Sequence, residues 1–113
     1  MNLDSKYKKL IGILNTLESQ LKFFRTAQEL ETVLESKVAL NNMYDYSLEF
    51  CFEIFNLISS GNMEFHDFID ILQNIRSLHL KYYKFYSTYV NPDKDPLKTT
   101  INILENSLIF FKK

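Results

Sequence analysis

Three carboxylates recur every four residues in the middle of the chain, at Asp45, Glu49 and Glu53, and we call them the acidic stripe. On a helix, this spacing places all three side chains on one face. Carboxylates of helical bundles bind two iron ions when a histidine stands three residues after a glutamate, and neither His66 nor His79 has an acidic residue at that distance. The acidic stripe is therefore predicted to face solvent or to contact a basic partner, and we expect no metal and no cofactor there.

Basic and aromatic residues alternate within residues 76–89. In proteins that bind single-stranded nucleic acid, such residues contact phosphates and stack on bases. The same pattern arises when lysines face water and tyrosines line a bundle, and tyrosine is also common where proteins bind one another. This segment and the acidic stripe are the predicted partner-binding regions. The candidate residues of the segment are Arg76, His79, Lys81, Tyr82, Tyr83, Lys84, Tyr86 and Tyr89.

The sequence gives little support to an enzyme. His79 has no nucleophile in a recognisable pattern beside it, so a general base is not expected. The segment from Tyr44 to Ile58 resembles the aromatic and acidic second helix of HEPN-type ribonucleases and their nucleotidyltransferase partner domains. The ribonuclease signature of that family has four residues between its arginine and its histidine, whereas Arg76 and His79 are separated by two. The main prediction is therefore a non-enzymatic protein. The resemblance of the segment from Tyr44 to Ile58 leaves a HEPN-like toxin or antitoxin component as an alternative.

Composition excludes several kinds of site. The 113 residues contain two glycines, one cysteine and two histidines, so we expect no glycine-rich phosphate loop, no zinc site and no disulfide framework. No apolar run approaches the roughly 20 residues of a membrane span, no secretory signal is visible, and Cys51 lies alone in an apolar segment. These features predict a cytoplasmic protein. The abundance of lysine, asparagine and isoleucine indicates an AT-rich genome.

Apolar residues repeat with a helical period along nearly the whole chain, and no alternating strand pattern competes with it. The repeat predicts an all-α fold, an antiparallel helical bundle of four main helices plus one short helix, in a single domain over residues 1–113. The main helices are predicted over about residues 3–24, 42–59 and 63–90 and from 96 to the C-terminus, and the short helix over about 27–39.

Local signals mark the ends of these helices. Thr26 followed by Glu29 forms a capping box that would start the short helix, and a continuation of the first helix through this point is the alternative. Asn42 is a suitable N-cap for the next helix, and Gly61 is a suitable residue just after its end. Asp95, which precedes a proline, is the predicted N-cap of the last helix.

Two of the predicted helices carry apolar seams that bear on the candidate sites. The helix over 42–59 is apolar on most of its circumference, which indicates a central position. Its predicted core seam consists of Tyr44, Leu48, Cys51, Phe55 and Ile58. The predicted seam of the helix over 63–90 consists of Phe65, Phe68, Leu72, Ile75, His79, Tyr82, Tyr86 and Tyr89.

The formal net charge of -1 hides a segregation of charge along the chain. Residues 1–25 carry +3, residues 26–75 carry -8 and residues 76–113 carry +4, which predicts surfaces of opposite sign. The main prediction is a small protein-interaction module, of an adaptor, inhibitor or immunity type, that binds a protein partner through helix faces. A nucleic-acid-binding protein that uses residues 76–89 is the alternative from another class. A homodimer is a further alternative, because the seams are long and rich in aromatic residues.

Overall fold

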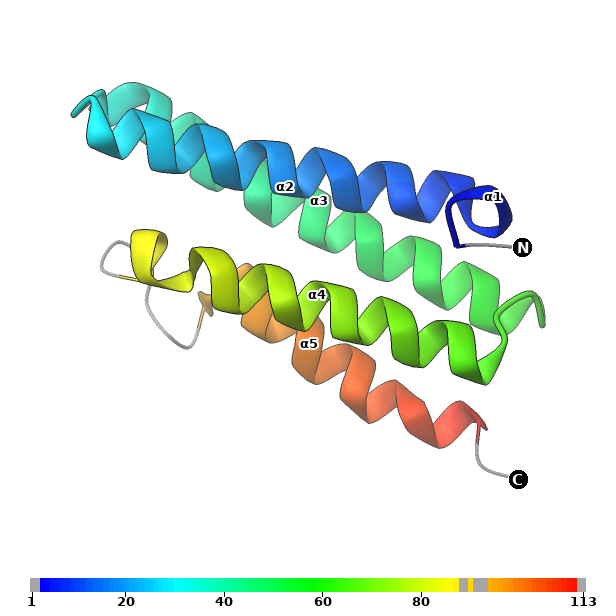
Figure 1. The fold of residues 1–113 in the computed structure, drawn as a ribbon. Coiled ribbons are helices and arrows are strands. Elements are labelled where there is room, and N and C mark those ends of the chain that lie inside the picture. Colours follow the sequence, from blue (N-terminus) through cyan, green and yellow to red (C-terminus); the bar gives the residue numbers. More distant parts are fainter. Residues whose placement is uncertain (1–2, 88–89, 91–93, 112–113) are drawn as a thin grey trace.

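The computed structural model describes residues 3–87, 90 and 94–111, and it confirms the all-α helical bundle (Figure 1). Within this described part, every helix is too short or too polar to cross a membrane. The elements are α1 (Leu3–Lys6), α2 (Lys8–Glu29), α3 (Val33–Ser59), α4 (Phe65–Tyr86), α5 (Pro96–Asn106) and the 3-10 helix η2 (Ser107–Phe111).

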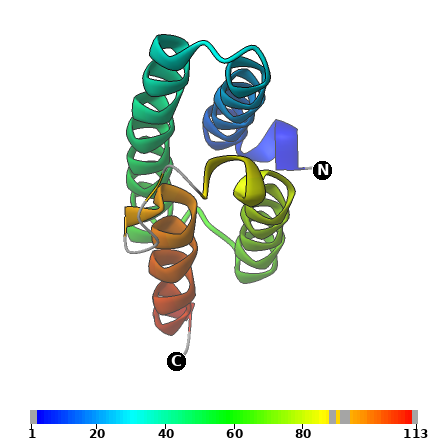
Figure 2. The same ribbon diagram turned by 90° about the vertical axis from the view of Figure 1, so that its left-hand side faces the viewer.

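Four helices surround one core. The helices α2 and α3 form one long hairpin, and α4 and α5 form a second hairpin that lies against it (Figure 1). Viewed from one end, α3 lies beside α2 and α5, and α4 lies beside the same two helices, so the four helices form a ring (Figure 2). Each contributes large side chains to the centre, of which Leu17, Phe50, Phe68 and Leu104 are completely buried.

The first hairpin differs from the prediction, because the short helix over 27–39 does not exist as a separate element. Thr26 lies inside α2, and the chain reverses instead between residues 30 and 32. Glu31 adopts a positive φ of 58° there, and both the amide and the hydroxyl of Thr32 donate hydrogen bonds to the carbonyl of Ala27. These hydrogen bonds provide a partner for a carbonyl group at the end of α2, and the capping signal at Thr26 does not start a new helix.

The predicted helix start at Asn42 is also wrong. Residues 33–39 continue through Asn42 without a break, so that α3 is one helix of 27 residues. The side chain of Asn42 donates a hydrogen bond to the amide oxygen of Gln20 at 3.0 Å, across the hairpin. Asn42 therefore links α3 to α2 instead of capping a helix.

The buried face of α3 is rotated from the predicted seam. Tyr44 and Leu48 are exposed, although Cys51 is buried as predicted. Apolar residues occupy most of the circumference of α3, so their period alone does not select one face. The buried face also includes small side chains, which a search for large apolar residues passes over. The buried residues of α3 are Ala39, Met43, Ser47, Phe50, Cys51 and Ile54.

Two other helix ends agree with the local signals. Gly61 has a φ of +75° just after Ser60, the C-cap of α3, as expected for a residue that ends a helix. The carboxylate of Asp95 accepts hydrogen bonds from the amides of Leu97 and Lys98, at 3.1 and 3.2 Å, which confirms it as the N-cap of α5. The helix α4 is shorter than predicted, and Tyr89 lies outside the described residues.

The substitutions Gly12→Ala and Gly61→Ala are expected to change the free energy of unfolding in opposite directions. An added Cβ at Gly12, inside α2, meets no atom within 4 Å, so alanine should raise stability by about 1 kcal/mol through its higher helix propensity. At Gly61 the positive φ disfavours alanine, which should lower stability by about 1–2 kcal/mol. Urea unfolding followed by circular dichroism measures both changes, and an equal response of the two variants would contradict this account.

Candidate functional site

Two tyrosines of the segment 76–89 belong to the core. Tyr82 and Tyr86 are 1% and 0% exposed, whereas Tyr83 is 40% exposed. A buried ring cannot stack on a base or contact a partner, so Tyr83 is the one described tyrosine of this segment with an accessible ring. Residues 82 and 86 lie four positions apart on the inner face of α4, as the seam predicts.

Tyr86 and His79 converge on Asp95, a carboxylate that is only 2% exposed. The hydroxyl of Tyr86 donates a hydrogen bond to Oδ1 of Asp95 at 2.9 Å, and Nε2 of His79 lies 3.1 Å from Oδ2. Burial, followed by the nearby charge of Asp95, raises the pKa of Tyr86 far above its usual range, so this hydroxyl remains a hydrogen-bond donor. The ring of Tyr83 packs on the imidazole of His79 with centroids 4.9 Å apart. These contacts tie the end of α4 to the start of α5, and they engage His79 in a structural role.

Two basic side chains of the segment, those of Arg76 and Lys81, contact neighbouring helices. Arg76 pairs with Glu105 of α5 at 3.5 Å, so Arg76 and His79 each contact an acidic partner. Lys84 is exposed, and its ammonium lies 5.2 Å from the ring centre of Phe85. The described segment thus presents Lys81, Tyr83 and Lys84 outward and buries Tyr82 and Tyr86. Arg76 and His79 are partly exposed, and each contacts an acidic residue.

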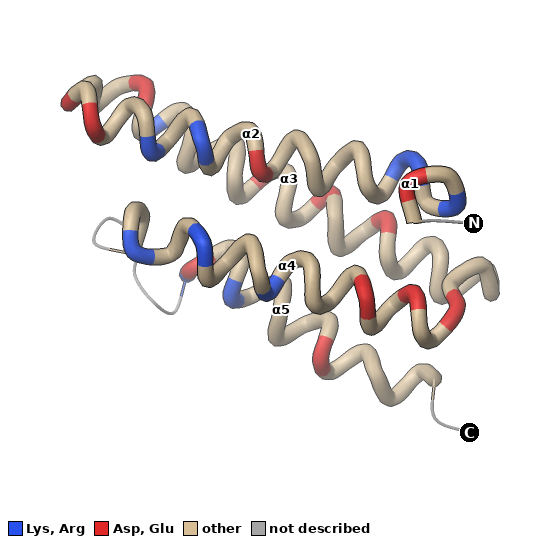
Figure 3. The backbone as a smooth tube through the Cα atoms, viewed as in Figure 1, with Lys and Arg blue, Asp and Glu red and all other residues tan. Residues whose placement is uncertain are grey.

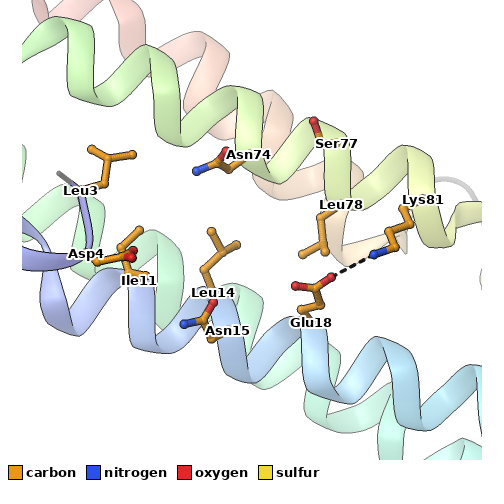
Figure 4. A pocket seen from close by; sticks show the side chains of 10 residues that line it. All are labelled: Leu3, Asp4, Ile11, Leu14, Asn15, Glu18, Asn74, Ser77, Leu78 and Lys81. Atoms are coloured by element: carbon orange, nitrogen blue, oxygen red, sulfur yellow. Dashed lines mark hydrogen bonds and ion pairs between the residues drawn. The ribbon is translucent and has the colours of Figure 1, made fainter.

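A cleft between α2 and α4 has a volume of about 360 Å³. Figure 4 shows its walls, with the ion pair between Lys81 and Glu18 at one end, where Nζ and Oε2 are 3.5 Å apart. Its lining mixes apolar residues such as Leu14 with uncharged amides such as Asn15 and Asn74. This mixture lacks a convergent set of reactive groups, so the cleft suggests no specific chemistry.

The acidic stripe lies on the outer side of α3. Asp45 and Glu49 are exposed, while Glu53 is partly buried and pairs with Lys9 of α2, with Nζ and Oε2 3.1 Å apart. The structure therefore separates the stripe into one residue that joins two helices and two residues that face solvent. In Figure 3 the acidic residues of α3 appear as red bands on the backbone tube.

An exposed apolar surface, which includes two residues of the predicted core seam, lies beside these carboxylates. Tyr44, Leu48 and Phe52 are 38%, 56% and 61% exposed, and they recur every four residues. We call these three residues the apolar stripe. Asp45 and Glu49 each follow a residue of the apolar stripe, and they therefore lie about 100° further around α3. The one signal that could have revealed this stripe is that α3 has more apolar residues than a single buried face can hold.

A hollow of about 470 Å³ lies between the apolar stripe and α5. Tyr44 and Leu48 line it from α3, and Thr99 and Ile103 line it from α5. Cys51 also lines this hollow; it is buried, its thiol lies 3.8 Å from the hydroxyl of Thr100, and burial raises the pKa of the thiol. A raised pKa disfavours the thiolate, so Cys51 is a packing residue here and not a nucleophile.

The substitutions Tyr86→Phe and Tyr82→Phe each remove a buried tyrosine hydroxyl and should have different effects on the free energy of unfolding. Tyr86→Phe removes a hydrogen bond to a buried carboxylate and should lower the free energy of unfolding by about 2 kcal/mol. The hydroxyl of Tyr82 is buried without a hydrogen-bond partner among the described residues, so Tyr82→Phe should leave stability unchanged or raise it by up to about 1 kcal/mol. Urea unfolding at neutral pH measures both variants, and a larger loss for Tyr82→Phe would refute this assignment.

The chain was also compared with known proteins. No family model, curated protein or solved structure matches it.

Proposed function

We propose that the protein is a non-enzymatic interaction module, of the adaptor, inhibitor or immunity type, that binds an amphipathic helix of a protein partner on the outer face of α3. The observation that carries this proposal is the exposed apolar stripe, which lies beside the hollow against α5 and beside two carboxylates that form no ion pair among the described residues. Large apolar side chains that recur along an exposed helix are typical of surfaces that receive a partner helix.

The apolar stripe provides the binding free energy in this proposal. Complete burial of a leucine or phenylalanine side chain contributes about 1.5–3 kcal/mol, and Leu48 and Phe52 are each more than half exposed in the free protein. The hollow beside them receives a side chain from the partner helix. The apolar face of that helix therefore covers Leu48 and Phe52.

The neighbouring charges determine the orientation of the partner helix. Asp45 and Glu49 form no ion pair among the described residues, and each lies beside a residue of the apolar stripe, while Asp45 also lines the hollow against α5. A partner helix with lysine or arginine on the corresponding flank neutralises both carboxylates. Such contacts at the rim of an interface favour the correct partner and accelerate association.

The alternative functions receive less support from the side-chain positions. Nucleic-acid binding through residues 76–89 would rely on tyrosine rings, and those of Tyr82 and Tyr86 are buried. A HEPN-like activity would rely on Arg76 and His79, which contact acidic residues of their own chain. A homodimer through the apolar stripe is an outcome that the experiment below distinguishes.

The proposal predicts that Leu48→Ser combined with Phe52→Ser weakens partner binding strongly without unfolding the protein. Both side chains are largely exposed, so the helical content should be unchanged, whereas a captured partner should bind at least tenfold more weakly. The matched control is Leu80→Ser on α4, because Leu80 is 80% exposed and lies on another helix. Affinity capture from the host with the wild-type chain and both variants, followed by titration of the recovered partner, measures the effect.

Two further measurements locate the partner on this surface. A photo-crosslinking residue in place of Phe52 should react with the partner, and the same residue in place of Leu80 should not. The variant Asp45→Asn with Glu49→Gln should weaken binding and reduce its dependence on salt. A partner that binds the Leu48 and Phe52 double variant as tightly as the wild type would refute the proposal, and so would crosslinking of position 52 only to a second copy of this chain.

A further inference from the structure

A second group of polar side chains lies at the start of α4, away from the acidic stripe. It consists of Glu64, His66 and Asp67, and one oxygen or nitrogen atom from each lies within 4.8 Å of the other two. Asp67 is buried, whereas Glu64 and His66 are exposed. Imidazole nitrogens and carboxylate oxygens both serve as ligands for zinc.

The distances within the group are compatible with a metal ion bound between the three side chains. Nε2 of His66 lies 3.4 Å from Oε2 of Glu64 and 3.3 Å from Oδ1 of Asp67. Both distances exceed the roughly 2.7–2.9 Å of a charge-assisted hydrogen bond. Ligands about 2.0–2.1 Å from a tetrahedral zinc ion are separated by about 3.3 Å, which is close to both observed values.

A second layer of contacts orients the two carboxylates. Lys6 lies 2.8 Å from Oε1 of Glu64 and 2.9 Å from Oδ2 of Asp67, so that one oxygen of each carboxylate is occupied. Oδ2 of Asp67 also accepts a hydrogen bond from the hydroxyl of Tyr7, which is buried. The other oxygen of each carboxylate is the one that lies near His66. Metal ligands are typically held by hydrogen bonds of this kind.

We propose that Glu64, His66 and Asp67 form a binding site for a divalent transition-metal ion such as Zn²⁺, with Tyr7 as a positioning residue. The three side chains occupy three positions of a tetrahedral site, and the exposure of His66 leaves the fourth position accessible to water or to a ligand atom from a partner. Counting cysteine and histidine residues predicts no zinc site because that count omits carboxylate ligands.

The surroundings also limit the affinity of this site. The ammonium of Lys6 and the positive end of the α4 dipole both repel a cation. Two carboxylates provide the opposing charge. The affinity should therefore be weaker than that of a structural zinc site formed by cysteine and histidine, and the site should bind metal reversibly.

Titration of the tag-free full chain with Zn²⁺ in a calorimeter tests the proposal. The wild-type chain should bind one ion per molecule, and His66→Gln should weaken binding at least tenfold. Tyr7→Phe keeps the ring but removes the hydrogen bond to Asp67, and it should weaken binding about 10–100-fold, as is typical for such contacts. Titration with Co²⁺ should give the strong visible absorption of a tetrahedral complex, and His66→Gln should abolish that absorption.

Matched controls separate this site from other binding. His79→Gln removes the other histidine and Cys51→Ser removes the thiol, and both variants should keep the wild-type affinity within about twofold. Circular dichroism confirms that each variant is folded. Absence of wild-type binding at millimolar Zn²⁺, or an unchanged affinity of His66→Gln, would overturn the proposal. Neither result bears on the binding surface of α3, which lies on a different helix.

Discussion

The buried carboxylate of Asp95 determines where the second hairpin closes. It accepts hydrogen bonds from the amides of Leu97 and Lys98 at the start of α5 and from Tyr86 at the end of α4, while His79 lies beside its second oxygen. An uncompensated buried charge is very unfavourable, so these donors must remain in place whenever the protein is folded. The corner that they form positions α5 against α3. The hollow beside the apolar stripe exists only because α5 is held there.

The lengths of the helices explain why part of α3 remains uncovered. The helix α3 has 27 residues and is about 40 Å long, whereas α5 has 11 residues and is about 17 Å long. A helix that is apolar on most of its circumference needs neighbours along its whole length, and α5 can cover only part of it. Leu34 and Val38, in the first turns of α3, are exposed together with Leu48 and Phe52. A partner helix on this side would supply the neighbour that the short α5 does not.

The sequence predicted the features that depend on residues close to one another along the chain. The fold class, the buried positions of Tyr82 and Tyr86 and the capping role of Asp95 follow from period and from local chemistry. The capping box at Thr26 failed because the turn after α2 offers a competing way to satisfy the helix end. The exposed face of α3 could not be predicted because apolar residues surround that helix. Contacts between distant residues, such as Lys6 with Asp67, have no counterpart in local spacing.

The segregation of charge along the sequence is partly cancelled in three dimensions. Lys6 pairs with Asp67 near the start of α4, and Lys9 pairs with Glu53 between α2 and α3, so basic residues of the first segment neutralise acidic residues of the middle segment. Along α4, acidic residues lie at the N-terminal end and basic residues at the C-terminal end, an order that the helix dipole favours (Figure 3). Asp45 and Glu49 gain no such compensation from the described residues. Because their charge borders an exposed apolar surface, a basic flank on a partner helix would stabilise the complex where the described residues form no ion pair with these carboxylates.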